Sequence, residues 1–175
     1  MHKFYEKTQL FLTILIVFFF TSCSNQQNME LAKKYPIIPS PQKITYGVKE
    51  LSFKSVRIHQ NDFKEEAQKL QDFFTKKGVK SQNDGIDIYF KKKTATKNQS
   101  KEYYRLEIGK DITIIAATNK GAFYGIQTLK QLYRNKQNNS AVPKVSIEDW
   151  PAFKIRGFMH DTGRNYQSVT LLKEQ

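Results

Sequence analysis

The stretch YRLEIGKDITIIAATNKGAFYGIQTLKQLY, residues Tyr104–Tyr133, decides the fold of this 175-residue chain. Apolar and polar side chains alternate through residues 104–108, which is typical of a half-buried strand, and residues 112–115, with the sequence ITII, predict a second strand. The turn residues GKD at 109–111 join the two runs, so we expect a β-hairpin. From Asn119 onward the apolar side chains recur with the period of a helix. The stretch therefore predicts two paired strands followed by a helix, with Thr118 or Asn119 as its cap.

The chain upstream repeats this pattern of strand and helix. Residues 53–59 predict a short strand, and residues 86–90, with the sequence IDIYF, predict another by their period of two. Between them, apolar residues at helical spacing predict a helix. Asn61 or Asp62 would cap this helix and Gly78 would end it.

Together these elements predict an α+β fold, a small sheet with two helices on one of its faces. Because the strands alternate apolar and polar residues, one face of the sheet should be buried under the helices and the other exposed. Prolines at positions 36, 39 and 41 force an extended backbone and mark the beginning of a domain that we place at residues 36–149. A polar loop over 135–140 and a last strand over 142–147 complete the predicted domain.

Lysine and arginine outnumber aspartate and glutamate by 29 to 16, which gives a formal net charge of +13. Such an excess raises the question of a polyanionic partner. The lysines are spread along the whole chain, and the densest run, Lys91–Lys93, leads into a polar stretch of loop composition. We therefore expect a lysine-rich solvated surface and no nucleic-acid partner.

The N-terminus has the composition of an export signal. A basic start precedes an almost unbroken apolar run over residues 10–20, which is shorter than the roughly 20 residues that a membrane-spanning helix needs. Phe20-Thr21-Ser22-Cys23 resembles the lipobox of bacterial lipoproteins. We therefore expect a signal peptide over 1–22 and acylation of Cys23. A free thiol in a cleaved peptide is the alternative.

An acylated Cys23 would make the protein an exported, membrane-anchored lipoprotein of the bacterial cell envelope, at the periplasm or the cell surface. Residues 23–35, polar and rich in Asn and Gln, predict a tether between the anchor and the folded part. Because Cys23 is the only cysteine in the chain, an internal disulfide and a metal site built on paired thiolates are excluded.

Three stretches, in the same order along the chain, resemble glycoside hydrolase family 20, the β-N-acetylhexosaminidases. PIIPSP at residues 36–41 is similar to the proline-rich beginning of the family's small N-terminal domain. AATNKGAFYGIQTLKQL at 116–132 is similar to the last helix of that domain. IEDWPAFKIRGFMHDTGRN at 147–165 is the most specific stretch, and it resembles the junction into the first strand of the family's catalytic (β/α)₈ barrel.

The resemblance implies an enzyme that removes terminal β-linked N-acetylglucosamine or N-acetylgalactosamine from a glycan, with the substrate's own acetamido group as nucleophile. This chemistry needs an adjacent Asp and Glu, one to stabilise the acetamido group and one to protonate the leaving oxygen. The chain contains no Asp-Glu dipeptide. We therefore expect residues 150–175 to be the truncated beginning of a TIM barrel and the fragment to be inactive alone, and we expect no cofactor.

Arg156 is the residue to which the resemblance assigns a substrate contact, because the family's arginine at this position grips the hydroxyls of the terminal sugar. A guanidinium suits this role, since its fixed fork of donors can bind two neighbouring oxygens and its charge is permanent. The alternative is an ion pair with Asp161 at the end of the strand. Asp161 and Arg164 are expected to support the pocket, and no residue is assigned as catalytic or as a metal ligand.

Two functions of other classes also fit parts of the sequence. A non-catalytic surface lipoprotein could bind glycan or a protein partner through residues 36–149, which have enough elements to fold alone. Nucleic-acid binding rests on the net charge only, and an exported chain rarely meets that partner.

Overall fold

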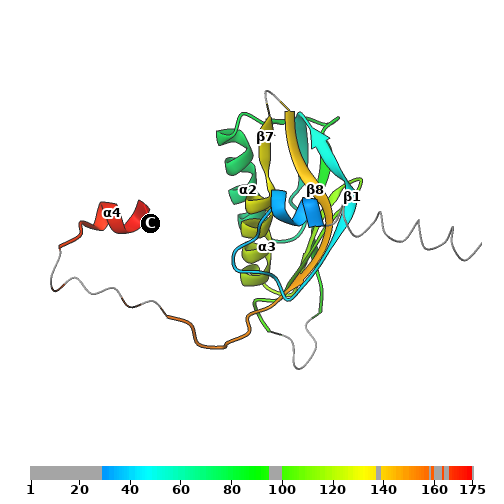
Figure 1. Cartoon of the computed structure of the whole chain (residues 1–175). Helices are drawn as coiled ribbons and strands as arrows, with labels where there is room; N and C mark the ends of the chain where they lie inside the picture. Colours follow the sequence, from blue (N-terminus) through cyan, green and yellow to red (C-terminus); the bar gives the residue numbers. More distant parts are fainter. Residues whose placement is uncertain are drawn as a thin grey trace, which may run out of the picture.

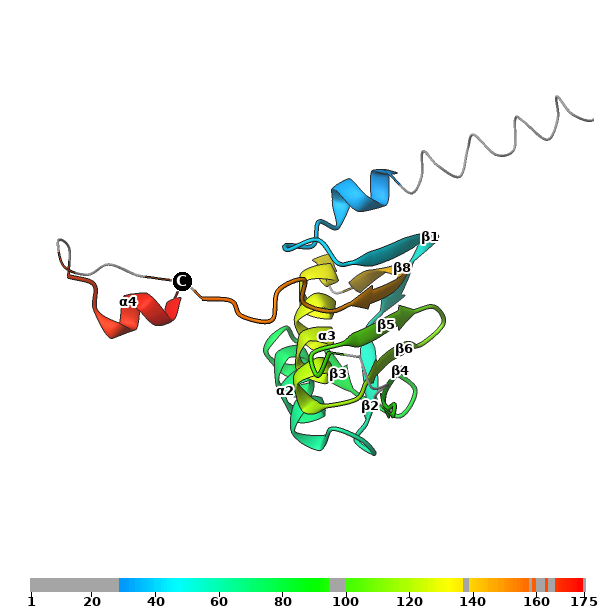
Figure 2. The same cartoon turned by 90° about the horizontal axis from the view of Figure 1, so that it is seen from below.

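The computed structural model describes residues 29–94, 100–136, 139–157, 159, 163 and 166–174. Over these ranges the chain forms one mixed sheet of eight strands, with helices α2 and α3 on one face (Figures 1 and 2). The strands are β1 Lys43–Phe53, β2 Ser55–His59, β3 Lys80–Ser81, β4 Ile86–Lys92, β5 Tyr104–Ile108, β6 Ile112–Ala116, β7 Arg134–Lys136 and β8 Asn139–Asp149. The helices are α2 Lys64–Lys76, α3 Asn119–Leu132 and α4 Val169–Glu174, and residues 29–34 are helical too.

The predicted hairpin is confirmed and lies in the middle of the sheet. β5 and β6 pair antiparallel, with Leu106 opposite Ile114. The strand order is β1-β8-β5-β6-β4-β2-β3, and β7 pairs with β8. β8 runs antiparallel to β1 and β5, whereas β6, β4 and β2 run parallel. The parallel pair of β2 and β4 is possible because α2 supplies the long crossover connection between them.

The core lies between the sheet and helices α2 and α3. Leu106, Ile114 and Ile147 of neighbouring strands are fully buried, as are Ile126 and Leu129 of α3. Along β5 and β6 the buried positions alternate with half-buried or exposed ones, which confirms that the helices cover one face only. Each large apolar side chain buried in this way contributes about 1.5–3 kcal/mol, so this layer holds the domain together.

Helix α3 begins as predicted and lies close to the chain before β5. The Gly121 backbone N–H donates to Thr118 Oγ1 at 3.3 Å, which confirms Thr118 as the cap. A β-carbon at position 121 would come within 2.2 Å of the Tyr103 carbonyl oxygen. Glycine is therefore required here, because any side chain would push the first turn of α3 away from Tyr103.

The predicted cap of α2 is wrong, although its end is confirmed. Phe63 is the N-cap residue, in the left-handed conformation with φ 54°, and no side chain caps the helix. The Asp62 carboxylate instead accepts a hydrogen bond from the Lys92 N–H at 3.0 Å, so it fixes the segment before α2 to the end of β4. Gly78, with φ 76°, ends the helical run as predicted.

Two other expectations about strands need correction. β1 is missing from the predicted elements because its register shifts between Tyr46 and Glu50, which breaks the alternation of buried and exposed positions. The loop expected over 135–140 holds most of β7 and the first residues of β8, which pair antiparallel. Their polar side chains hide this pairing, since strand prediction depends on alternation with apolar residues.

After β8 the chain continues as an exposed segment. Residues 150–157 form no strand, so the barrel strand expected there is not observed; such a strand needs paired neighbours on both sides. Beyond it, the Leu171 N–H donates to Ser168 Oγ at 3.2 Å, so Ser168 caps α4. Within the described ranges, every helix is too short or too polar to cross a membrane.

Candidate functional site

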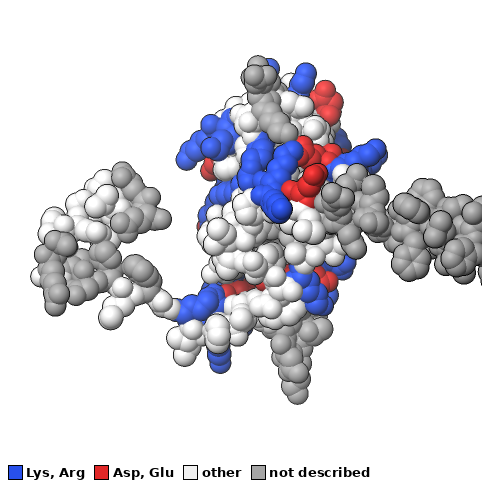
Figure 3. Space-filling view, in the orientation of Figure 1, with Lys and Arg blue, Asp and Glu red and all other residues white. Residues whose placement is uncertain are grey.

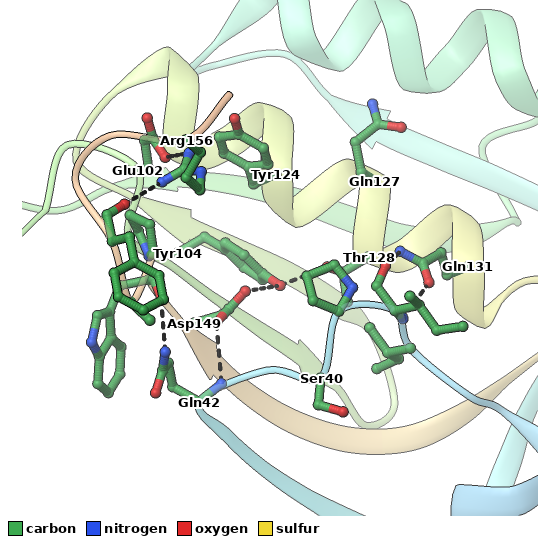
Figure 4. Close-up of a pocket in the computed structure, with 17 residues that line it drawn as sticks. Ser40, Gln42, Glu102, Tyr104, Tyr124, Gln127, Thr128, Gln131, Asp149 and Arg156 are labelled. Atoms are coloured by element: carbon green, nitrogen blue, oxygen red, sulfur yellow. Dashed lines mark hydrogen bonds and ion pairs between the residues drawn. The ribbon is translucent and has the colours of Figure 1, made fainter. Parts of the chain in front are cut away.

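A pocket of about 530 Å³ lies where the chain enters and leaves the small domain, and we call it the junction pocket (Figure 4). Residues of the proline-rich segment 37–42, of β5 and α3, and of the exit segment 149–156 line it. The lining combines aromatic rings with amide and carboxylate groups. Such a pocket has apolar surface for a ring and polar groups that fix its orientation.

Asp149, the last residue of β8, connects three walls of the junction pocket. Its Oδ1 accepts from the Gln42 backbone N–H at 3.1 Å, and its Oδ2 accepts from the Tyr104 hydroxyl at 3.3 Å. The Tyr104 oxygen also lies 2.6 Å from Thr128 Oγ1 of α3. Burial raises the pKa of Tyr104, and the charge of Asp149 raises it further. The phenol therefore stays protonated and can donate at any physiological pH.

The proline-rich segment is held by two amide side chains. Gln131 of α3 accepts from the Ile38 N–H at 2.9 Å and donates to the Ile38 carbonyl at 3.1 Å. Gln42 donates through Nε2 to the Trp150 carbonyl at 3.3 Å. The beginning of the domain and its exit are therefore fixed side by side, although they lie far apart in the sequence.

Arg156 lies at the edge of the junction pocket, beside Glu102 and Tyr124 (Figure 4). Its guanidinium pairs with the Glu102 carboxylate and donates to the Phe153 carbonyl at 2.9 Å. The hydrogen bond to Glu102 is the main reason that the pKa of Arg156 is raised, so the side chain is always cationic. With 43% of the side chain exposed, a ligand can reach it.

Arg156 is the one predicted site residue that the structure describes, and its guanidinium forms an ion pair with Glu102. Asp161, Arg164 and Cys23 lie outside the described residues, so their roles stay predictions. Sequence reasoning missed Glu102, Tyr104 and Asp149. Alternation along β5 did place Tyr104 on the buried face, but Asp149 resembles a turn-forming acid before Trp150-Pro151, and its partners are remote in sequence.

The charged side chains of the described residues indicate no metal site, and the face shown in Figure 3 carries no continuous basic stripe. No group of three or more His, Cys, Asp or Glu side chains in the part of the chain that the structure describes is placed to hold a metal ion. On the face shown in Figure 3, basic side chains gather in separate groups with acidic ones beside them, and an uncharged area lies between the groups. The junction pocket is therefore the candidate site that the described residues offer.

Comparison with known families identifies the domain that carries this pocket. Residues 34–150 match glycosyl hydrolase family 20, domain 2, which is more than half of the chain. The chain belongs to glycosyl hydrolase family 20. This match confirms the family resemblance of the sequence, and it covers the whole sheet, α2, α3 and Asp149.

Relatives in this family are considerably longer than the chain. The β-hexosaminidase of Porphyromonas gingivalis strain W83 is 37% identical over 97 residues, which are 51% of this chain and 12% of that protein. The N,N'-diacetylchitobiase of Vibrio harveyi is 41% identical over 66 residues, 37% of this chain and 7% of that protein. The chain therefore spans only a small part of the curated relatives that it matches.

Solved structures share the fold of the small domain. An inactive mutant of the family-20 exo-β-N-acetylglucosaminidase of Vibrio harveyi superposes with a TM-score of 0.63 at 24% identity, over 80% of this chain and 23% of that chain. The β-N-acetylhexosaminidase of Bacteroides fragilis gives a TM-score of 0.58 at 27% identity, over 79% of this chain and 29% of that chain. The mixed sheet with its helices is thus the fold of a known domain in longer family-20 proteins.

Proposed function

We propose that this chain is the N-terminal portion of an exo-acting β-N-acetylhexosaminidase, which removes terminal β-linked N-acetylglucosamine or N-acetylgalactosamine from glycans. The match of residues 34–150 to domain 2 of family 20 carries the proposal. The names of the relatives support it, since both the Porphyromonas and the Vibrio proteins are named for this class of activity. In this proposal a catalytic barrel begins after Asp149.

The proposed reaction divides between this chain and the barrel. Substrate-assisted hydrolysis needs an acid for the leaving oxygen and a carboxylate for the acetamido group, and the chain has no Asp-Glu dipeptide to supply them. What it supplies is binding through Arg156. The guanidinium can donate to two neighbouring sugar hydroxyls at once, and its position in the exit segment brings it to the boundary with the barrel.

Activity measurements test this proposal on the 175-residue chain and on the complete reading frame that contains it. With a chromogenic N-acetylglucosaminide, we expect no turnover above a blank from the chain and clear hydrolysis from the complete protein. In the complete protein, Arg156→Lys should raise KM at least about tenfold, since lysine lacks the planar fork. Lys154→Arg, two positions away, is the matched control and should leave KM unchanged.

Two results would contradict the proposal. The first is turnover by the 175-residue chain alone, because it would place the chemistry in the small domain. The second is a complete reading frame without a barrel that carries a neighbouring Asp and Glu. The same assay with an N-acetylgalactosaminide shows which sugar is preferred.

We also propose that the mature protein is an envelope lipoprotein acylated at Cys23, because Phe20-Thr21-Ser22-Cys23 follows an apolar export signal. Two acyl chains give stable membrane anchoring, whereas one gives only reversible binding. Mass spectrometry of the protein from bacterial membranes should find an N-terminal diacylglyceryl cysteine. Cys23→Ser should lose this mass and leave the membrane fraction, while Ser24→Ala should keep both.

A non-catalytic glycan-binding role is the second candidate, and it is favoured by the aromatic and amide groups of the junction pocket. In that case the 175-residue chain alone should bind glycans with terminal N-acetylhexosamine on an array. Gln127→Ala, which changes the lining without removing a described contact of the exit segment, should weaken that binding. Absence of binding by the chain would remove this candidate.

A further inference from the structure

Three consecutive residues of the small domain each hold one residue of the exit segment. The Glu102 carboxylate pairs with Arg156, and the Tyr103 ring stacks on Trp150 with centroids 6.2 Å apart and an interplanar angle of 25°. The Tyr104 hydroxyl donates to Asp149 at 3.3 Å. Residues 102–104 therefore hold the exit segment at three points and fix its course along the domain.

Polar contacts and one ring contact fix this course, and burial contributes little. Phe153 and Ile155, the large apolar side chains of the segment after Trp150, are 74% and 90% exposed. Asp149 holds the inner end, because its carboxylate accepts from both Tyr104 and Gln42. Gln42 adds a second bond to the Trp150 carbonyl, so the direction of the chain is set before Pro151.

We propose that Asp149 is a positioning residue that fixes the exit segment on residues 102–104 and thereby places Arg156 at the junction pocket. This inference rests on the proposed function only where it takes Arg156 to bind the sugar. A carboxylate suits the position because it only accepts hydrogen bonds and faces two donors. Asparagine would keep one of these bonds and turn a donor toward the other partner, and alanine would remove both bonds and leave the Gln42 N–H without its acceptor.

The single tryptophan of the chain, Trp150, reports on this placement directly. Acrylamide quenching of its fluorescence should increase at least about twofold in Asp149→Ala, because local opening exposes the ring. Asp149→Asn should show a smaller increase, and Tyr104→Phe should act in the same direction. Trypsin cleavage after Lys154 and Arg156 should accelerate in the same order, with the circular dichroism of the domain unchanged.

Glu148→Ala is the matched control for these variants. Glu148 is the neighbouring carboxylate, but it points to the other face of β8, where it pairs with Lys43 at 3.6 Å and Arg105 at 3.7 Å. Its trypsin cleavage should equal that of the wild type, and its quenching should increase less than that of Asp149→Ala, because the only contact of Glu148 that reaches Trp150 among the described residues runs through Lys43, which lies over the ring. The proposal is overturned if Trp150 in Asp149→Ala is quenched no more than in the wild type. If that variant does not fold, the same result in folded Tyr104→Phe overturns it.

The link to Arg156 is tested in the complete protein. Asp149→Ala should raise KM more than it lowers kcat, and Asp149→Asn should restore part of the loss, because displaced binding groups weaken substrate binding first. An unchanged KM would overturn the placement of Arg156 by Asp149. If the complete wild-type protein shows no hydrolysis, the proposed function fails, whereas the fluorescence result on Asp149 stands independently.

Discussion

The small domain and the exit segment differ in what holds them in place. In the domain, Leu106, Ile114 and Ile147 are fully buried, and each such side chain contributes about 1.5–3 kcal/mol. After Pro151, Ile155 is 90% exposed and Met159 is 91% exposed, so apolar burial contributes almost nothing to that part of the chain. Arg156 therefore takes its position from a few polar contacts with the domain.

This difference has a consequence for function in family 20. A domain with its own core can act as a rigid base, and binding groups are most precise when rigid elements support them. The exit segment joins this base to whatever follows it, and its exposed apolar residues are available for packing there. The small domain thus fixes the direction in which the chain leaves it.

The largest expected effect comes from the core. Leu106→Ala should lower the free energy of unfolding by about 2–5 kcal/mol, because it leaves a cavity opposite Ile114 and under α3. Ile155→Ala, in the exit segment, should change it by less than about 0.5 kcal/mol. Urea unfolding of the 175-residue chain measures both. Similar losses of unfolding free energy for the two variants would mean that the exit segment packs like the core, and would contradict the difference between the two regions.

The open face of the small domain is expected to give a smaller effect that depends on pH. Asp87 accepts hydrogen bonds from Arg57 at 2.5 and 2.8 Å and lies 2.7 Å from His59 Nε2. The hydrogen bonds from Arg57 are the main reason that the pKa of Asp87 is lowered below its ordinary value, and the contact with His59 is the second. A lowered carboxylate pKa stabilises the fold above the ordinary value of about 3.9 and loses this effect as the pH falls below it.

Asp87→Asn should therefore lower Tm by a few degrees at pH 7 and by less at pH 3, where the wild-type carboxylate has begun to lose its advantage. Thermal unfolding at the two pH values measures this difference. Asp84→Asn, in the exposed turn before β4, is the control and should behave like the wild type at both. An equal loss of Tm at pH 7 and pH 3 would show that the charge of Asp87 is unimportant.

Which parts of the fold and of the site could be predicted from the sequence depends on how far apart the interacting residues lie along the chain. The hairpin of β5 and β6 and the helix capped by Thr118 follow from local alternation and spacing, and the structure confirms them. The family follows from short motifs, and the match of residues 34–150 confirms it. β1 could not be predicted, because a register shift disturbs the alternation on which strand prediction depends.

The contacts of the junction pocket could not be predicted for a different reason, which is that they join residues far apart in the sequence. Periodicity shows which face a residue occupies but not which distant residue lies opposite it. Arg156 could be selected by family resemblance, yet its partner Glu102 lies 54 positions earlier. Asp149 accepts a hydrogen bond from the Gln42 N–H, which lies 107 positions earlier. Asp62 shows the same limit, because it binds the Lys92 N–H and leaves the nearby helix uncapped.

The smallest expected effect on stability belongs to the ion pair that joins the two regions. Glu102→Gln should change Tm by less than about 2 °C, since exposed ion pairs contribute little. Trypsin should nevertheless cleave after Arg156 faster than in the wild type, because the end of the exit segment loses its contact with the domain. Glu107→Gln is the control: it breaks a pair with Arg105 at 2.6 Å that lies within β5, so cleavage should stay unchanged. A large decrease in Tm for Glu102→Gln alone would mean that the exit segment stabilises the core, and the two regions would then have to be treated as one folding unit.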